Sequence, residues 1–317
     1  MNRNFAIRRW SWTLGVILVM ALLPSILPKF WTRLAMEILC FSIFAMSYNM
    51  VMGYGGMMSF GHAGFYGGAS YLVAILLTKT AVPTVVALIL GCLFGGLLGL
   101  IIGFFCVQLR AFYLAMLTMA FSQLIWAVIF KWYDMTGGDN GIIGIPVPAF
   151  ISTIENMYFF TLIITIICFY IFYRIIHSPF GLTLVALREN TQRIEFIGVN
   201  SNRYRLYAFT VSTFFSGLAG GIYTLISRGV FPDIASWGKS GEVLLCCVLG
   251  GMHNFFGPAV GTVLMILLEN VIGSYTERWP IILGLLFVLI VFFLPRGVLG
   301  YNLKDIASKF QRKEGIK

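Results

Sequence analysis

Two histidines stand out among the few polar side chains in the long apolar runs of this chain. His62 follows Ser59 in one glycine-rich stretch, and His253 precedes Asn254 in another. Each stretch begins Gly-Gly-Met and continues through polar residues to Phe and Gly, so the two resemble each other weakly. A helix broken by glycine exposes backbone N–H and C=O groups that can bind a zwitterionic solute. We predict that these four side chains line a solute path; the alternative is that each histidine only hydrogen-bonds a neighbouring helix.

The sequence shows no arrangement typical of a catalytic, metal or cofactor site. All six cysteines fall within apolar runs and lack the spacing of metal ligands, which is typical of small buried residues. The phosphate-binding loop Gly-x-x-x-x-Gly-Lys-Ser/Thr does not occur. We therefore expect neither an enzyme nor a chain that binds ATP itself.

The composition is that of a membrane protein. Of the 317 residues, 59% are hydrophobic and 11% are charged, whereas soluble domains carry about 25% charged residues. The 22 lysines and arginines outnumber the 12 acidic residues and give a net charge of +10. Basic residues between spans set the topology and contact anionic lipid headgroups, so we expect membrane lipids and not nucleic acid as partners.

Apolar runs of about 20 residues, the length that crosses a bilayer, follow one another along the chain. A further segment, residues 241–272, is broken by glycine and proline and could form two spans or a re-entrant pair of half-helices. The sequence predicts one all-α, polytopic transmembrane domain over residues 1–317, with about eight to ten transmembrane helices and glycine-broken half-helices. The predicted spans are residues 12–27, 34–52, 63–77, 82–107, 112–130, 158–176, 206–226 and 280–294.

Basic residues indicate how these spans are oriented. Three arginines precede the first span and no small-residue cleavage site follows it, so we expect an uncleaved span with a cytoplasmic N-terminus. The alternation of spans then places residues 132–156 in an external loop and residues 178–205 in a cytoplasmic loop. Residues 296–317 form a basic cytoplasmic tail.

Three acidic residues lie within or beside the predicted spans. Glu37 follows Arg33 by four positions, which predicts a structural ion pair at the edge of the membrane. Glu242 and Glu269 lie near the beginning and end of the broken segment, so we expect them at the membrane interfaces and not in a proton relay.

The cytoplasmic loop of residues 178–205 is helical in pattern but unusually polar. Ser178 suits an N-cap, Pro179 the first helical position, and Gly198 a left-handed C-terminal stop. Apolar residues recur on one side at helical spacing, and residues of both charges occupy the other. Helices that bind lipid surfaces favour a basic polar face, so the mixed charges favour one amphipathic helix that docks into a groove of another protein.

These motifs, in this order, resemble a known family, the LivM-type permease subunits of branched-chain amino acid ABC importers. The resemblance covers most of the chain. It rests on residues 53–71, 109–118, 136–141, 178–200, 214–223, 249–252 and 295–299. In that family the charged cytoplasmic helix docks into the ATPase subunit. The resemblance implies this coupling role for Arg188, Glu189, Arg193, Glu195 and Gly198, although Thr191, Gln192 and Arg193 replace the family's usual alanine-rich centre.

The resemblance also implies a location, partners and a substrate class. The location is the bacterial inner membrane. The partners are a second homologous permease, two ATPase subunits that bind ATP, and a periplasmic or lipid-tethered solute-binding protein that meets Asp139 and Asn140. The expected substrates are leucine, isoleucine and valine. The alternatives are a permease for urea or short amides and an ion-coupled secondary transporter, which would need no docking helix.

Overall fold

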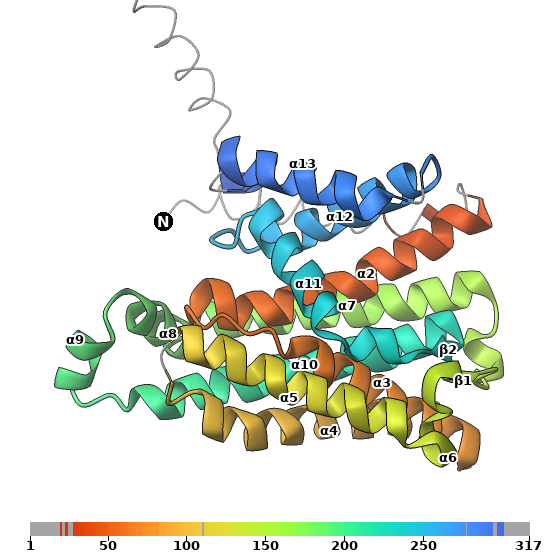
Figure 1. Cartoon of the computed structure of the whole chain (residues 1–317), viewed down its shortest axis with the longest axis horizontal. Coiled ribbons are helices and arrows are strands. Elements are labelled where there is room, and N and C mark those ends of the chain that lie inside the picture. The colour runs from red at the N-terminus through yellow and green to blue at the C-terminus, as the bar shows by residue number, and fades with distance from the viewer. Residues whose placement is uncertain are drawn as a thin grey trace, which may run out of the picture.

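The structure is a computed structural model that describes residues 20, 23–24, 28–80, 82–109, 111–276, 278–293 and 297–300 (Figure 1). Most of the predicted first span and of the predicted cytoplasmic tail lies outside the described residues. The described chain is a bundle of helices with one small sheet, in which β1 (Ile142–Ile143) pairs antiparallel with β2 (Gly229–Val230). The predicted all-α, polytopic class is confirmed.

Five helices in the described part of the chain are long and apolar enough to cross a membrane. Shorter helices complete the bundle. The long helices are α2 (Lys29–Asn49), continued by the π-helix η1 (Met50–Tyr54), α4 (Thr84–Cys106), α5 (Ala111–Lys131), α7 (Ile154–Ile176) and α10 (Ser201–Ser227). The shorter ones are α3 (His62–Lys79), α6 (Tyr133–Thr136), α8 (Pro179–Glu189), α9 (Thr191–Phe196), α11 (Trp237–Gly250), α12 (Gly257–Gly273) and α13 (Trp279–Phe293).

Helix α10 lies at the centre because small residues let its neighbours approach its backbone. A Cβ atom on Gly99 of α4 would lie 1.8 Å from Thr213 Oγ1 of α10. A Cβ atom on Gly220 of α10 would lie 2.1 Å from the carbonyl oxygen of Tyr66 in α3. Packing through small residues is the usual way in which membrane helices associate.

The opposite face of α4 is suited to lipid. Ile89, Leu93 and Leu97 follow one another at four-residue spacing, and each is more than half exposed. Residues four apart lie on one side of a helix, so these side chains form a continuous apolar row. Such a row on a membrane helix with a buried opposite face is typical of contact with lipid tails.

The predicted break near His62 is confirmed. Helix α2 widens into the π-helix η1, and the chain then leaves helical geometry until α3 begins at His62. Gly56 in this break has a φ of +66°, a conformation that favours glycine. The ring of His62 lies 5.0 Å from that of Tyr48 in α2, so α3 begins beside α2 and inside the bundle.

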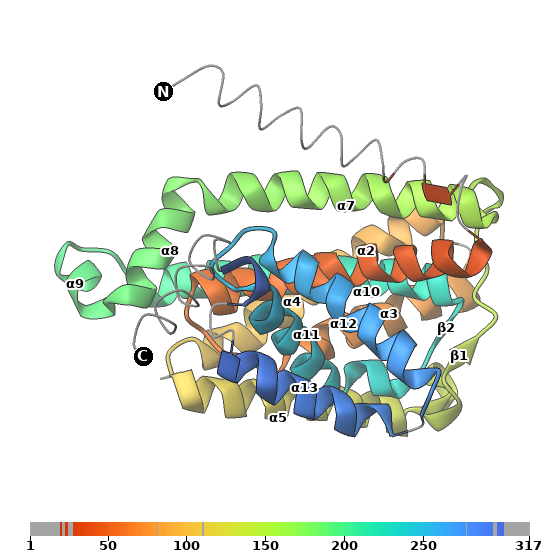
Figure 2. The same ribbon diagram turned by 90° about the horizontal axis from the view of Figure 1, so that it is seen from above.

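Two segments from the second half of the chain meet this break. The turn between Gly250 and Gly257 joins α11 to α12, which pack against each other through glycines beside this turn (Figure 2). This turn meets the break at Asn49, whose Nδ2 donates to the carbonyl oxygen of Met252. The second segment is the start of α11. There the first turn of α11 meets the first turn of α3, where Ser240 Oγ accepts a hydrogen bond of 2.9 Å from Ala63 N. The motif match did not show this second contact, because the contact depends on where α11 begins and not on shared residue types.

The two ends of the bundle differ in construction. Helices α8 and α9 project beyond one end, which we call the α9 end (Figure 1). The short sheet of β1 and β2, with α6, lies at the other, which we call the β end (Figure 1). The predicted cytoplasmic and external loops therefore lie at opposite ends of the bundle.

Candidate functional site

Ser59 and His62 form part of a buried hydrogen-bond network between three helices. His62 Nδ1 lies 3.0 Å from Ser59 Oγ, and His62 Nε2 lies 2.9 Å from Ser212 Oγ of α10. Ser212 Oγ donates to the carbonyl oxygen of Ser47 in α2 over 2.5 Å. Ser47 Oγ lies 2.9 Å from Ser216 Oγ. These contacts fasten the start of α3 to α2 and α10.

Both ring nitrogens of His62 thus have protein partners, and the side chain is 0% exposed. Phe65 and Phe209 pack edge-on against the ring. Ser59 is also fully buried. In this conformation the two residues hold the break in place, which is the alternative that the sequence left open; their role in a solute path stays a prediction.

His253 and Asn254 occupy a different environment, the turn between α11 and α12. His253 is exposed, and Asn254 Nδ2 donates to the carbonyl oxygen of Leu299 over 2.7 Å. Met252 in the same turn accepts a hydrogen bond of 3.1 Å from Asn49 Nδ2, near the end of α2. The turn is therefore attached to the helix that carries the first break, and the path role of its two polar residues stays a prediction.

The cytoplasmic loop contains two helices instead of the single helix predicted. Asn190 is extended (φ −154°, ψ 95°) and separates α8 from α9. Its Oδ1 atom accepts a hydrogen bond of 3.0 Å from Arg193 N and so caps α9. Asparagine readily forms such local bonds, which explains the interruption. The predicted cap at Ser178 is confirmed, because its side chain accepts a hydrogen bond from Gly181 N.

Arg188 points into the bundle, unlike the other predicted coupling residues. Its guanidinium donates to the carbonyl oxygen of Gly53 in the π-helix, and its aliphatic stem packs on Gly56. The π-helix leaves this carbonyl free, since Met57 N bonds back to Val51 instead. Arg188 therefore joins the cytoplasmic loop directly to the first break.

The remaining predicted coupling residues face outward. Glu189, Arg193, Glu195 and Gly198 are exposed, and Glu195 accepts a hydrogen bond from Ser201 at the start of α10. The apolar side of α8 is already buried within this chain, through Leu184 and Leu187. The sequence predicted that this apolar side would dock into a partner's groove, and that prediction is wrong because the side is already covered.

Sequence reasoning missed the apolar tip of the loop. Phe196 at the end of α9 is 90% exposed and Ile197 is 73% exposed, and α9 projects beyond the bundle (Figure 1). The sequence does hold a signal for this tip. Two large apolar residues precede the predicted glycine stop, and they do not belong to the apolar side of the predicted helix. An exposed apolar pair outside the spans is a candidate protein contact.

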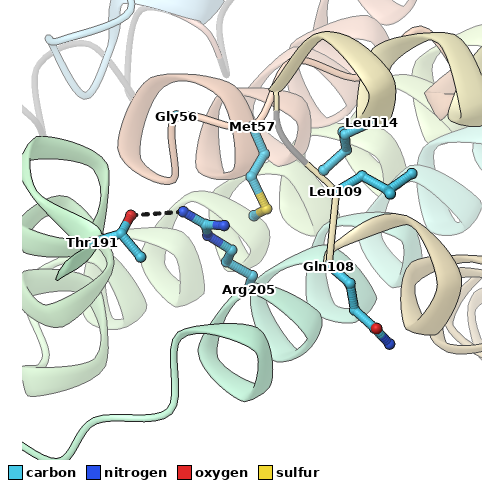
Figure 3. Close-up of a pocket in the computed structure, with 7 residues that line it drawn as sticks. All are labelled: Gly56, Met57, Gln108, Leu109, Leu114, Thr191 and Arg205. Carbon is cyan, nitrogen blue, oxygen red and sulfur yellow. Dashed lines mark hydrogen bonds between the residues drawn. The ribbon is translucent and has the colours of Figure 1, made fainter. Parts of the chain in front are cut away.

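A pocket of about 370 Å³ lies where the loop meets the break (Figure 3). Arg205 of α10 reaches into it and donates through Nη2 to Thr191 Oγ1 over 2.9 Å. Its lining comes from the first break, the α4–α5 connection, α5, α9 and α10. The lining residues are Gly56, Met57, Gln108, Leu109, Leu114, Thr191 and Arg205. Movement of α9 would change the shape of this pocket.

At the β end, the predicted docking residues lie on the surface. Asp139 and Asn140 are exposed in a tight turn, and Asn140 Nδ2 donates to Tyr133 Oη over 2.8 Å. Gly137 and Gly138 before them both have positive φ angles, which fix the turn. Their contact with a binding protein stays a prediction.

Gly198 gives the first testable prediction. Its φ of +90° disfavours any side chain, although nothing lies within 4 Å of a Cβ atom there. Gly198→Ala should therefore destabilise the end of α9 by about 1 kcal/mol without a clash. Hydrogen exchange should show faster exchange in α9 and unchanged exchange in α10; equal protection in both proteins would contradict this.

The sequence that folds in this way is similar to those of known transport proteins. The family described as "Branched-chain amino acid transport system / permease component" matches residues 31–294, which span α2 to α13. The high-affinity branched-chain amino acid transport system permease protein LivM of Salmonella typhimurium is 25% identical over 329 residues, covering 95% of this chain and 77% of its own.

LivM of Escherichia coli is 26% identical, covering 90% of this chain and 74% of its own. The probable branched-chain amino acid transport permease protein LivM of Methanocaldococcus jannaschii is 23% identical, covering 81% and 89%. No solved structure gives a significant match. A match of this length, over a polytopic bundle with the expected breaks and cytoplasmic loop, shows that this chain is a multi-pass inner-membrane protein of the branched-chain amino acid transport permease family.

Proposed function

We propose that this chain moves leucine, isoleucine and valine across the inner membrane as one permease subunit of an ATP-driven importer. Support for the substrates comes from the relatives, whose names refer to branched-chain amino acids. Support for an external drive comes from the chain itself, which lacks a phosphate-binding loop but has a projecting cytoplasmic loop. The ATP would be bound by separate ATPase subunits.

One observation carries the mechanism: Arg188 joins the cytoplasmic loop to the break between α2 and α3. An ATPase that gripped the exposed tip of α9 would pull on α8, and Arg188 would transmit this movement to Gly53. Alternating access in transporters commonly arises when rigid helices rock around a central site built from broken helices. The loop would then act as the lever and the break as the part that moves.

The other proposed partners bind the remaining surfaces of the chain. We propose that a second homologous permease completes the path, and that two ATPase subunits meet the α9 end. The solute-binding protein would dock at the β end, where Asp139 and Asn140 are exposed. Sidedness follows from the arginines of the cytoplasmic loop, since basic residues favour the cytoplasmic side.

Uptake by the complete importer tests the substrate. We expect proteoliposomes that contain both permeases, both ATPases and the binding protein to accumulate leucine with ATP, and isoleucine and valine to compete with it. Competition by urea or acetamide, without competition by valine, would favour the alternative permease for short amides and overturn the proposed substrate. A variant with the ATPase's nucleotide site disabled is the control.

A further inference from the structure

A charged cluster lies on the face formed by α2, α11 and α12. Lys239 Nζ is 2.5 Å from Glu242 Oε2, with side chains 28% and 31% exposed. Lys239 Nζ also lies 5.2 Å from the centre of the Phe41 ring of α2. Glu37 of α2 and Glu269 of α12 interact electrostatically with Lys239. Three helices thus bring together one lysine and three glutamates that lie far apart in the sequence.

This arrangement corrects one expectation from the sequence. Glu37 and Arg33 form no ion pair in the part of the chain that the structure describes, and the charge of Lys239 acts on Glu37 from the neighbouring α11. Glu242 lies in the second turn of α11, a short helix whose start meets the start of α3 inside the bundle. Its position relative to the membrane interface stays a prediction.

A bilayer that α2 spans would enclose the cluster at the depth of its lipid tails. Glu37 comes eight residues after Lys29, the first residue of α2, which is about 12 Å at a rise of 1.5 Å per residue. The hydrocarbon core of a bilayer is about 30 Å thick. On the other side of α11, Ser240 hydrogen-bonds the buried start of α3. The charges are thus on the outer face of the bundle, well inside the span of α2.

Lipid is an unfavourable neighbour for this face. With all four groups ionised, one positive and three negative charges leave an excess of two negative charges. A charged side chain in the middle of a bilayer is costly, and such residues usually face a bundle interior or a water-filled cavity. The row of Ile89, Leu93 and Leu97 on α4 shows the apolar character that a lipid-facing surface of this chain has.

We propose that the face carrying Lys239, Glu37, Glu242 and Glu269 lines the water-filled solute path, which the second permease closes from the opposite side. Water would solvate the unbalanced charge, and the excess carboxylates would favour the ammonium group of a passing amino acid. The identity of the solute rests on the proposed function, whereas the presence of water at this face does not.

Gly241, between the charged residues, offers a direct test of access by water. No atom lies within 4 Å of a Cβ atom at this position, so Gly241→Cys fits without displacement. All six native cysteines are free and buried, so the introduced thiol is the accessible one. In the complete importer we expect it to react with a cationic, membrane-impermeant methanethiosulfonate at least tenfold faster than Leu93→Cys on α4. Leu93 is 54% exposed but faces lipid, which makes it the matched control.

Charge gives a second measurement at the same position. The cationic reagent should react faster at Gly241→Cys than an anionic reagent of equal size, and Lys239→Gln should increase this ratio. An unreactive Gly241→Cys in the assembled importer, with and without ATP, would show that protein covers the face and would overturn the proposal. Equal reactivity at Leu93→Cys would overturn it as well, because exposure alone would then explain the labelling.

Leucine uptake separates this proposal from the proposed function. We expect Lys239→Gln to slow uptake at least tenfold in an importer that still assembles. If the unaltered importer takes up no leucine but Gly241→Cys still reacts, the substrate is wrong and the water path stands. If the unaltered importer takes up leucine and Lys239→Gln does so equally well, with Gly241→Cys unreactive, the path runs elsewhere.

Discussion

Replacing Arg188 with alanine is expected to reduce leucine uptake by the complete importer at least about tenfold while ATP hydrolysis continues. The substitution removes the hydrogen bond from the guanidinium to Gly53 and leaves that carbonyl without its donor. Hydrogen bonds of charged groups contribute about 1.5–3 kcal/mol, and each 1.4 kcal/mol corresponds to a factor of about ten. The measurement is uptake and ATP hydrolysis by the same proteoliposomes, which gives solute moved per ATP.

Two further variants make this result specific. Arg203→Ala removes an exposed arginine from the first turn of α10 and should leave uptake unchanged. Gly56→Ala should reproduce the defect, because its Cβ atom would lie 2.5 Å from Arg188 Cγ and its φ is positive. Normal uptake per ATP in Arg188→Ala would show that the loop acts on the bundle by another contact.

Replacing His62 with alanine should destabilise the folded chain by about 3 kcal/mol or more. Large-to-small substitutions in a packed core cost about 2–5 kcal/mol. Here the change also leaves Ser59 and Ser212 without the ring nitrogens that they now contact. We expect the midpoint of thermal unfolding in detergent to fall, and the yield of assembled importer to fall with it.

His253→Ala is the matched control, since both histidines belong to glycine-rich stretches that look alike in sequence. His253 is exposed in the turn between α11 and α12, so its loss should change the unfolding midpoint little. Equal effects of the two substitutions would contradict the different environments that the structure gives them. Unchanged stability in His62→Ala would show that the buried network does not hold α3 in place.

Much of this fold could be predicted because a lipid bilayer limits the secondary structures that a chain can adopt. Backbone groups in a bilayer must bond within their own segment, so apolar runs of sufficient length become helices. The predicted spans over α4, α5, α7 and α10 are confirmed for this reason. The break before His62 was also predictable, because glycines with polar neighbours inside an apolar run are typical of an interrupted membrane helix.

The parts that could not be predicted depend on contacts between distant segments. The sequence shows Arg188 as one of several charges on a helix, and only the position of the π-helix beneath it reveals that it points inward. Glu37, Lys239 and Glu269 are separated by 30 to 232 positions, so no local pattern relates them. The division of the loop at Asn190 depends on a choice between helix and cap that asparagine leaves open.

The central claim is that this permease is driven from outside, through its cytoplasmic loop. The most direct measurement compares leucine accumulation in two sets of proteoliposomes. One contains the complete importer with ATP, and the other contains the permease chains without ATPase subunits under an imposed proton or sodium gradient. The account predicts accumulation only in the first set. Accumulation in the second set, driven by a gradient alone, would contradict it.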